Sequence, residues 1–226
     1  VVLDSPGFLV NRLLMPYLNE ATLCLPEGAG SVSEIDAAMG REGFGWPMGP
    51  FELMDMLGLD VCHDIITYLA SQYGERMSEA PLLEALVRSG RLGIKTGGGF
   101  YDYPERRDAA AIPALIQSLQ EDMDRASATP FSVARVMARF VNEAFLCLEE
   151  SIAARDDIDT ACILGLGMAV RVGGRAVRMG PLAYAAHVGL DVLVQRLRRL
   201  EGLFGSRFQP APALVAEMVT DEHTGQ

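Results

Sequence analysis

Residues 8–27 read FLVNRLLMPYLNEATLCLPE, and residues 131–150 read FSVARVMARFVNEAFLCLEE. The second stretch is an altered copy of the first, displaced by 123 positions. The residues that recur unchanged at this spacing are Phe8, Val10, Arg12, Asn19, Glu20, Ala21, Leu23, Cys24, Leu25, Glu27, Ile35 and Asp36. Further along, the spacing becomes 131, and Gly49-Pro50, Gly58-Leu59-Asp60 and Ala80-Pro81 recur. A fixed spacing broken by one insertion indicates a duplicated structural unit.

The two copies differ where chemistry would be expected. Asn11 is replaced by Ala134 in the second copy, and Pro16 by Arg139. The segment KTGGGFY at residues 95–101 has no second version, because the chain stops before it. We therefore expect any chemistry in copy one, with copy two as its packing partner.

The composition is typical of a globular protein long enough for one large core or two ordinary domains. Of the 226 residues, 50% are hydrophobic and 22% are charged, and no apolar run approaches the roughly 18–20 residues of a membrane span. The net charge of −11 argues against nucleic-acid binding. The four cysteines form no C-x-x-C pair and fit buried free thiols in a reducing cytoplasm. A start at Val1 without methionine or secretory pattern suggests a piece of something longer.

Hydrophobic periodicity predicts helices throughout and no strand. In copy one we expect helices at 8–27 with a kink at Pro16, 31–40 with a capping box from Ser31 to Glu34, 50–73 as one long helix containing Gly58, and 80–89. One amphipathic helix at about 112–125 is expected in the linker. In copy two we expect helices at 131–153, a short one capped by Asp156, 181–201 and 212–220, with a glycine-rich loop at 165–180. The fold class is all-α.

Taken alone, most of the unusual residues have ordinary structural explanations. No G-x-G-x-x-G motif follows a strand, and Ile94 stands before Lys95 where a phosphate loop needs glycine. The three histidines lack metal-site spacing, and Trp46-Pro47-Met48 and Gly97–Gly99 suit core filling and a turn. Asn11 could be a helix cap, an internal hydrogen-bond partner or a ligand contact. The residues alone predict a duplicated helical domain of open purpose.

A longer set of motifs resembles one family. The motifs are Pro6-Gly7-Phe8-Leu9-Val10-Asn11-Arg12-Leu13-Leu14, Asn19-Glu20-Ala21, Ile35-Asp36, Gly45-x-Pro47-Met48-Gly49-Pro50-Phe51-Glu52-Leu53, Asp55, Gly58-Leu59-Asp60 and Gly93-x-Lys95-Thr96-Gly97-x-Gly99-Phe100-Tyr101. In order and spacing they resemble the C-terminal domain of 3-hydroxyacyl-CoA dehydrogenases, and the rest resembles the degenerate second copy carried by fused bacterial β-oxidation enzymes. The resemblance implies copy one at 1–103, a linker at 104–129 and copy two at 130–226. It also implies a fold of the 6-phosphogluconate dehydrogenase C-terminal-like type, with the two repeats packed as a pseudo-dimer.

The resemblance also implies a division of labour. An N-terminal Rossmann domain before Val1 would bind NAD and carry a histidine–glutamate catalytic pair, so this chain would hold no catalytic, cofactor-binding or metal-binding residue and be inactive alone. The helical part would line the site that oxidises 3-hydroxyacyl-CoA to 3-oxoacyl-CoA, with Asn11 reaching the substrate near the reacting carbon. Arg12 and Lys95 could face CoA phosphates or form local salt bridges. The alternative is a non-catalytic oligomerisation or partner-binding module derived from such an enzyme. In either case we expect a cytoplasmic protein, and the arginines from Arg171 to Arg178 have no assigned role.

Overall fold

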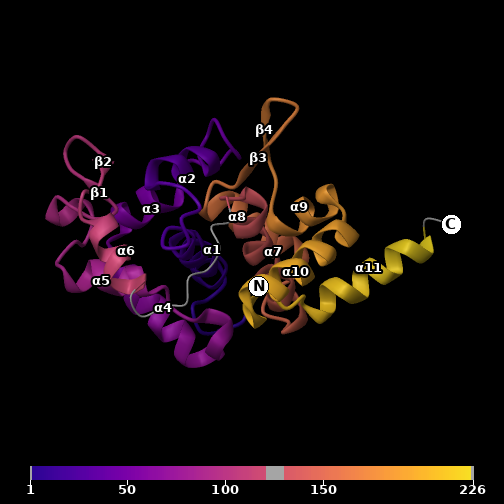
Figure 1. Cartoon of the computed structure of the whole chain (residues 1–226). Helices are drawn as coiled ribbons and strands as arrows, with labels where there is room; N and C mark the ends of the chain where they lie inside the picture. Colours follow the sequence, from indigo (N-terminus) through magenta and orange to yellow (C-terminus); the bar gives the residue numbers. More distant parts are fainter. Residues whose placement is uncertain (1, 121–129, 225–226) are drawn as a thin grey trace.

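Two helical units with the same order of helices lie side by side in the computed structural model, which describes residues 2–120 and 130–224 (Figure 1). Copy one contains α1 (Val10–Cys24), α2 (Val32–Met39), α3 (Pro50–Leu57), α4 (Leu59–Tyr73), η1 (Gly74–Met77), α5 (Pro81–Arg88), η2 (Ile94–Thr96) and β1 (Tyr101–Asp102). The segment after it contains β2 (Arg107–Asp108), which pairs with β1, and α6 (Ile112–Gln120). Copy two contains α7 (Val133–Glu149), α8 (Arg155–Gly165), β3 (Ala169–Val172), β4 (Arg175–Arg178), α9 (Pro181–Val188), α10 (Leu190–Phe204), η3 (Ser206–Phe208) and α11 (Pro212–Thr224). The order α1 to α5 repeats as α7 to α11, which confirms the mostly helical, duplicated fold.

Helices α1 and α7 form the centre of the molecule and pack on each other (Figure 1). Most residues of both helices are buried, 12 of 15 in α1 and 12 of 17 in α7. Tyr17 of α1 and its repeat equivalent Phe140 of α7 meet edge to face with ring centroids 6.2 Å apart. Trp46 stacks on Tyr17 at 4.8 Å and meets Phe140 at 5.3 Å. The pseudo-dimer expected from the shared apolar faces is confirmed, and one aromatic cluster joins its halves.

The recurring Gly-Pro pairs mark a capping arrangement used twice. The Asp36 carboxylate accepts hydrogen bonds from two backbone amides in the first turn of α3, at 2.8 and 2.9 Å. The Asp159 carboxylate does the same for α9, at 2.8 and 3.0 Å. A Cβ atom on Gly49 would lie 2.3 Å from Asp36, and one on Gly180 would lie 2.4 Å from Asp159. Each glycine therefore lets a carboxylate reach the helix N-terminus, where the unpaired amides need an acceptor.

Three of the expected helix boundaries are wrong. The single helix expected over 50–73 is two helices separated at Gly58, whose φ of 99° breaks the helical path. The same break at Gly189, with φ 98°, divides the helix expected over 181–201. Both are positive-φ conformations that glycine adopts without strain. The expected cap at Asp156 is also wrong, since Ala154 is the N-cap residue and Asp156 lies in the first turn.

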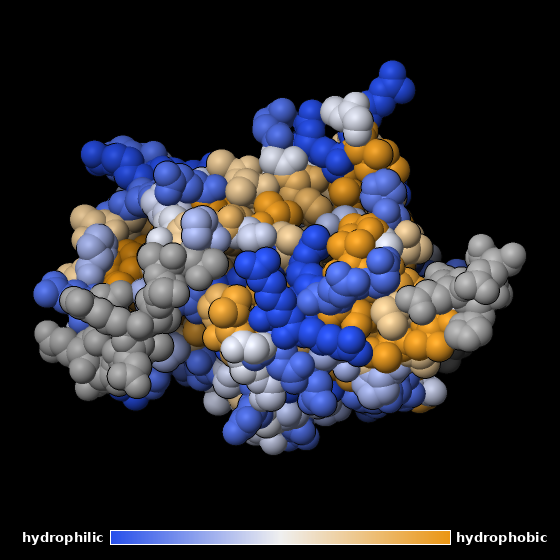
Figure 2. Space-filling model, turned by 45° about the vertical axis from the view of Figure 1, so that its right-hand side comes forward, coloured by the Kyte–Doolittle hydropathy of each residue, from blue (hydrophilic) through white to orange (hydrophobic). Residues whose placement is uncertain are grey.

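The expectation of a chain without strands is wrong as well. The glycine-rich segment in copy two forms a hairpin, β3–β4, whose two-residue turn is Gly173-Gly174 with φ 57° and 81°. Two positive φ angles are what a type I′ hairpin turn requires. The eight-residue insertion thus builds a hairpin, and the Arg171 amide donates to the Phe44 carbonyl of copy one at 2.8 Å. In Figure 2 the hydrophilic tip of this hairpin stands out from the body above apolar residues at its base.

The linker contributes a helix, and the four cysteines carry free thiols. Helix α6 packs on α5, which agrees with the linker helix expected from residue 112, while residues 121–125 of that expectation lie outside the described residues. The four cysteines are buried and free, as expected from their spacing. Within the described part of the chain no helix is long and apolar enough to cross a membrane.

Candidate functional site

The candidate site begins at the turn that leads into α1. Gly7 and Phe8 both have positive φ, 78° and 51°, and a Cβ atom on Gly7 would lie 2.8 Å from Leu69. The Phe8 side chain is 67% exposed, and Leu9 is an N-cap residue that makes no side-chain capping bond. Asn11 follows in the first turn of α1 and is half-buried. Among the described residues the side-chain amide of Asn11 has no hydrogen-bond partner, so Asn11 acts neither as a helix cap nor as an internal hydrogen-bond partner there.

Arg12, the next residue, is buried and points away from solvent into copy two. Its Nε donates to Glu143 at 2.9 Å, and its two terminal nitrogens donate to both oxygens of Glu150 at 2.8 and 2.9 Å. Burial alone would lower the pKa of Arg12, but Glu150 and Glu143 outweigh it and hold this pKa above its ordinary value. The guanidinium stacks 4.5 Å from the ring of Tyr73. A CoA phosphate could reach Arg12 only if these carboxylates moved away.

The same arrangement recurs in copy two with every partner exchanged. Arg135, the repeat equivalent of Arg12, donates from Nε to Glu20 at 2.7 Å and from its terminal nitrogens to Glu27 at 2.5 and 3.0 Å. Phe204 replaces Tyr73 and lies 3.7 Å from the Arg135 guanidinium. In each copy, therefore, one arginine binds two glutamates of the other copy. The residue before Arg135 is Ala134, which offers no polar group.

Lys95 lies in a loop that wraps around a buried carboxylate. Asp55 accepts from the backbone amides of Phe100 and Tyr101 at 2.9 and 3.0 Å, and a Cβ atom on Gly99 would lie 1.9 Å from its Oδ1. The glycines of KTGGGFY thus permit close approach to Asp55. The Lys95 ammonium, 45% exposed, lies 2.5 and 2.6 Å from the oxygens of Asp60. Among the described residues no hydrogen bond joins Lys95 to Asn11 or Arg12, and its contact with CoA stays a prediction.

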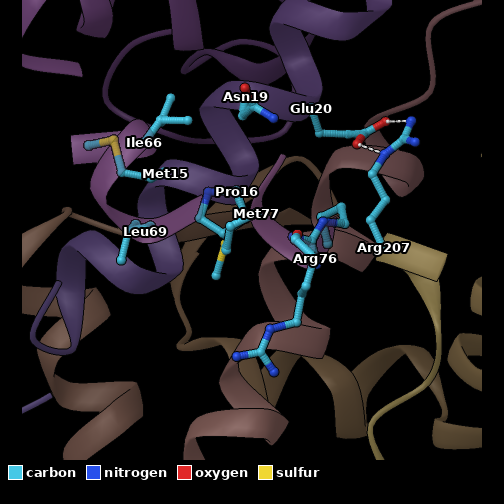
Figure 3. Close-up of a pocket in the computed structure, with 10 residues that line it drawn as sticks. Met15, Pro16, Asn19, Glu20, Ile66, Leu69, Arg76, Met77 and Arg207 are labelled. Atoms are coloured by element: carbon cyan, nitrogen blue, oxygen red, sulfur yellow. Dashed lines mark hydrogen bonds and ion pairs between the residues drawn. The ribbon is translucent and has the colours of Figure 1, made fainter. Parts of the chain in front are cut away.

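A small cavity lies where the copies meet (Figure 3). It measures about 10 Å³, room for about one water molecule. Pro16, Asn19, Glu20 and Arg207 are among the residues that line it, and Arg207 donates to Glu20 at 2.8 Å. An acyl group cannot enter such a space, so this cavity belongs to the contact between copies.

The glutamates that hold Arg12 and Arg135 were not assigned from the sequence, although a signal was present. Arg12, Glu20 and Glu27 all recur unchanged, yet they lie on an otherwise apolar helix and its C-terminal end. Charged residues that survive duplication on a buried face indicate buried partners. Because the sequence does not show the distance between copies, it could not say that the partners come from the opposite copy.

Comparison with known proteins agrees with this geometry. The model of the 3-hydroxyacyl-CoA dehydrogenase C-terminal domain matches residues 7–103 and again residues 131–226. The chain belongs to this family. The two matches correspond to the two packed units, so both copies of the dehydrogenase domain are retained.

Individual relatives point the same way. The chain is 36% identical over 217 residues to a fatty acid oxidation complex subunit alpha from Shewanella loihica, covering 95% of this chain and 30% of that protein. The crystal structure of 3-hydroxybutyryl-CoA dehydrogenase from Escherichia coli K12 superposes with a TM-score of 0.82 at 25% identity, covering 99% of this chain and 62% of that one. The dehydrogenase part of multifunctional enzyme 1 from C. elegans shares the fold at a TM-score of 0.66 and 24% identity, covering 94% of this chain and 48% of that one. The chain thus spans less than two thirds of each relative's length.

Proposed function

We propose that this chain is the helical, substrate-facing part of an NAD-dependent (S)-3-hydroxyacyl-CoA dehydrogenase of cytoplasmic fatty-acid β-oxidation. The observation that carries the proposal is Asn11. It lies in the first turn of α1 without a hydrogen-bond partner among the described residues, beside a buried arginine, in a chain of this family. A pure packing module needs no such residue there, and copy two has alanine at that position.

The described residues of this chain do not fit NAD. Their described β-structure consists of two separate two-stranded antiparallel sheets. Dinucleotide folds use a parallel sheet with a glycine-rich turn between a strand and a helix. Gly165 instead ends the helix α8, and Gly167 lies between that helix and an antiparallel strand. We therefore assign the cofactor, and the histidine–glutamate pair, to a Rossmann domain outside these 226 residues.

The task left to this chain is to bind and polarise the substrate. Nicotinamide held by the other domain would accept the hydride. As the 3-hydroxyl group loses its proton to the histidine base, negative charge develops on the 3-oxygen, and the Asn11 side-chain amide donates a hydrogen bond to it. A neutral amide neither takes nor gives a proton at ordinary pH. Asn11 therefore positions and polarises, and acid–base chemistry belongs to the other domain.

The test is Asn11→Ala in the protein that joins this chain to an NAD-binding domain. Losing one donor to a buried, charge-bearing oxygen costs roughly 1–3 kcal/mol, so kcat/KM for 3-hydroxyacyl-CoA should fall about 5- to 150-fold. The affinity for NAD should not change, because the cofactor binds elsewhere. Ala134→Asn is the matched control and should leave the rate unaltered.

Two outcomes would contradict the proposal. Unchanged kcat/KM in Asn11→Ala would remove Asn11 from the site and favour the non-catalytic module. Titration of the isolated chain with NAD should show no binding, and a micromolar Kd would contradict the assignment of the cofactor to another domain.

A further inference from the structure

We propose that Glu150, in copy two, is a positioning residue that holds Asn11 at the reacting oxygen by way of Arg12. This inference rests on the proposed function and deepens it, since it gives the second copy a part in catalysis. Copy two would then serve as more than a cover for the apolar face of copy one.

The start of α1 has few local reasons to stay in place. Its N-cap residue, Leu9, makes no side-chain hydrogen bond to the helix, and its first turn contains no acidic residue. A good cap stabilises a helix start by about 1 kcal/mol, and acidic side chains near the start add to it. The residues before the helix, Gly7 and Phe8, have positive φ, and Phe8 is exposed. The turn that presents Asn11 therefore depends on tertiary contacts.

Arg12 supplies those contacts and is adjacent to Asn11. All of its nitrogens donate to copy two, and the pairing with Glu150 is bidentate, at 2.8 and 2.9 Å. A bidentate guanidinium–carboxylate pair fixes orientation as well as distance. On its other side Arg12 stacks on Tyr73, whose hydroxyl donates to the Pro6 carbonyl at 3.3 Å. The helix start and the turn before it are thus held by one cluster.

Glu150 is the member of this cluster that can be tested without opening the core. Its side chain is 38% exposed, whereas Glu143 is fully buried. It is the C-cap residue of α7, so a change to glutamine keeps its length and one acceptor oxygen. Glutamine removes the charge and the second acceptor, which leaves Arg12 with one acceptor oxygen at position 150 where it had two, while its bond to Glu143 remains. The helix start can then shift while the fold stays intact.

The pseudo-symmetry supplies a matched control. Glu27 holds Arg135 through the same bidentate pairing, and Arg135 follows Ala134 in the first turn of α7. The change Glu27→Gln therefore makes the same chemical alteration at the equivalent position of the other copy. Only Glu150 acts next to the proposed substrate contact. Glu27 is 12% exposed and Glu150 is 38% exposed, so a general loss of stability should be at least as large in Glu27→Gln as in Glu150→Gln.

The experiment compares Glu150→Gln, Glu27→Gln, Asn11→Ala and the double variant Glu150→Gln/Asn11→Ala in the protein joined to its NAD-binding domain. Because a displacement of 1 Å can cost about 100-fold in rate, we expect Glu150→Gln to lower kcat/KM about 5- to 50-fold. Glu27→Gln should stay within about two-fold of the unaltered protein. If Glu150 acts through Asn11, adding Glu150→Gln to Asn11→Ala should cause no further loss.

Amide hydrogen exchange on the 226-residue chain gives a second readout. Glu150→Gln should speed exchange at residues 13–15, whose amides bond back to the start of α1, and leave residues 136–138 of α7 unchanged, and Glu27→Gln should do the reverse. Equal rate losses in both glutamine variants, additive losses in the double variant, or unchanged exchange at 13–15 would each overturn the inference. Normal kinetics of Glu150→Gln beside an impaired Asn11→Ala would overturn this inference alone. Normal kinetics of Asn11→Ala would overturn the proposed function itself, and with it any need for positioning.

Discussion

Asp36 and Asp159 occupy equivalent positions in the two copies but have different numbers of partners. Both carboxylates accept from two backbone amides, and Asp36 also accepts from the Tyr101 hydroxyl at 2.7 Å. The recurrence of Ile35-Asp36 as Ile158-Asp159 indicated a shared structural role. It could not indicate the third bond, because Tyr101 belongs to the KTGGGFY segment, which has no second version. Repeats reveal what two copies share, and partners unique to one copy need the structure.

This difference predicts unequal costs for one substitution. Asp36→Ala should lower the free energy of unfolding by about 2–4 kcal/mol, because it removes a cap and leaves the buried Tyr101 hydroxyl unpaired. Asp159→Ala removes a cap only and should cost about 1–2 kcal/mol. Urea unfolding of both variants of the 226-residue chain measures the two values. Equal losses would mean that the Tyr101 hydroxyl contributes nothing.

At the scale of elements, helix existence was predictable and helix continuity was not. The capping box of Ser31 and Glu34 is present, with bonds of 2.8 and 3.3 Å, and Pro50 begins α3 as expected. Hydrophobic periodicity continues through Gly58 because α3 and α4 both bury apolar residues, so the pattern hides the break. The hairpin was missed for a different reason. The pair Gly173-Gly174 between valine-containing strands is a hairpin signal that the short length of β3 and β4 obscured.

The break at Gly58 can be tested by substitution. In one continuous helix, Gly58→Ala would stabilise the protein, because alanine favours the helix by about 1 kcal/mol over glycine. At φ 99° alanine is strained, and its Cβ would also lie 2.9 Å from Asp60, so we expect a loss of about 1–3 kcal/mol. Gly202→Ala is the control, since Gly202 lies inside α10 with no atom within 4 Å of an added Cβ, and it should gain up to about 1 kcal/mol. A gain from both substitutions would contradict the observed break.

At the scale of the whole molecule, the copies are joined by charge as well as by apolar packing. The sequence predicted that 8–27 and 131–153 would pack together, since the same apolar positions recur in both. It could not predict the exchange of arginines, because Arg12 and Glu143 are 131 positions apart and each alone resembles a surface residue. Removing one member of a buried ion pair leaves the other uncompensated, which costs more than the pair itself contributes. The association of the copies therefore depends on the pairing of these arginines with glutamates of the opposite copy.

That dependence predicts how acid affects the fold. Burial works to raise the pKa of Glu20, but Arg207 and Arg135 outweigh it and hold this pKa below its ordinary value of 4.5. Burial also works to raise the pKa of Glu150, but the ion pair with Arg12 outweighs burial and lowers this pKa. A lowered pKa in the folded state contributes stability that is fully present above the unfolded-state pKa and is lost as pH falls through the folded-state pKa. The fold should therefore keep this contribution from pH 7 to about 5 and lose it progressively below about 4.5.

Glu20→Gln isolates the effect. Glu20 is 1% exposed and lies against two arginines, so the variant should be about 3–5 kcal/mol less stable than the unaltered chain at pH 7. Below pH 4.5 Glu20 is protonated more readily in the unfolded chain than in the folded chain, so the unaltered protein loses this contribution and the gap between the two proteins should shrink. Urea unfolding at pH 7, 5, 4 and 3 measures the gap, with the exposed Glu149→Gln as a control that should show little gap at any pH. A gap for Glu20→Gln that stays constant from pH 7 to pH 3 would show that ionisation of Glu20 does not hold the copies together, and that packing around Tyr17 and Phe140 is sufficient.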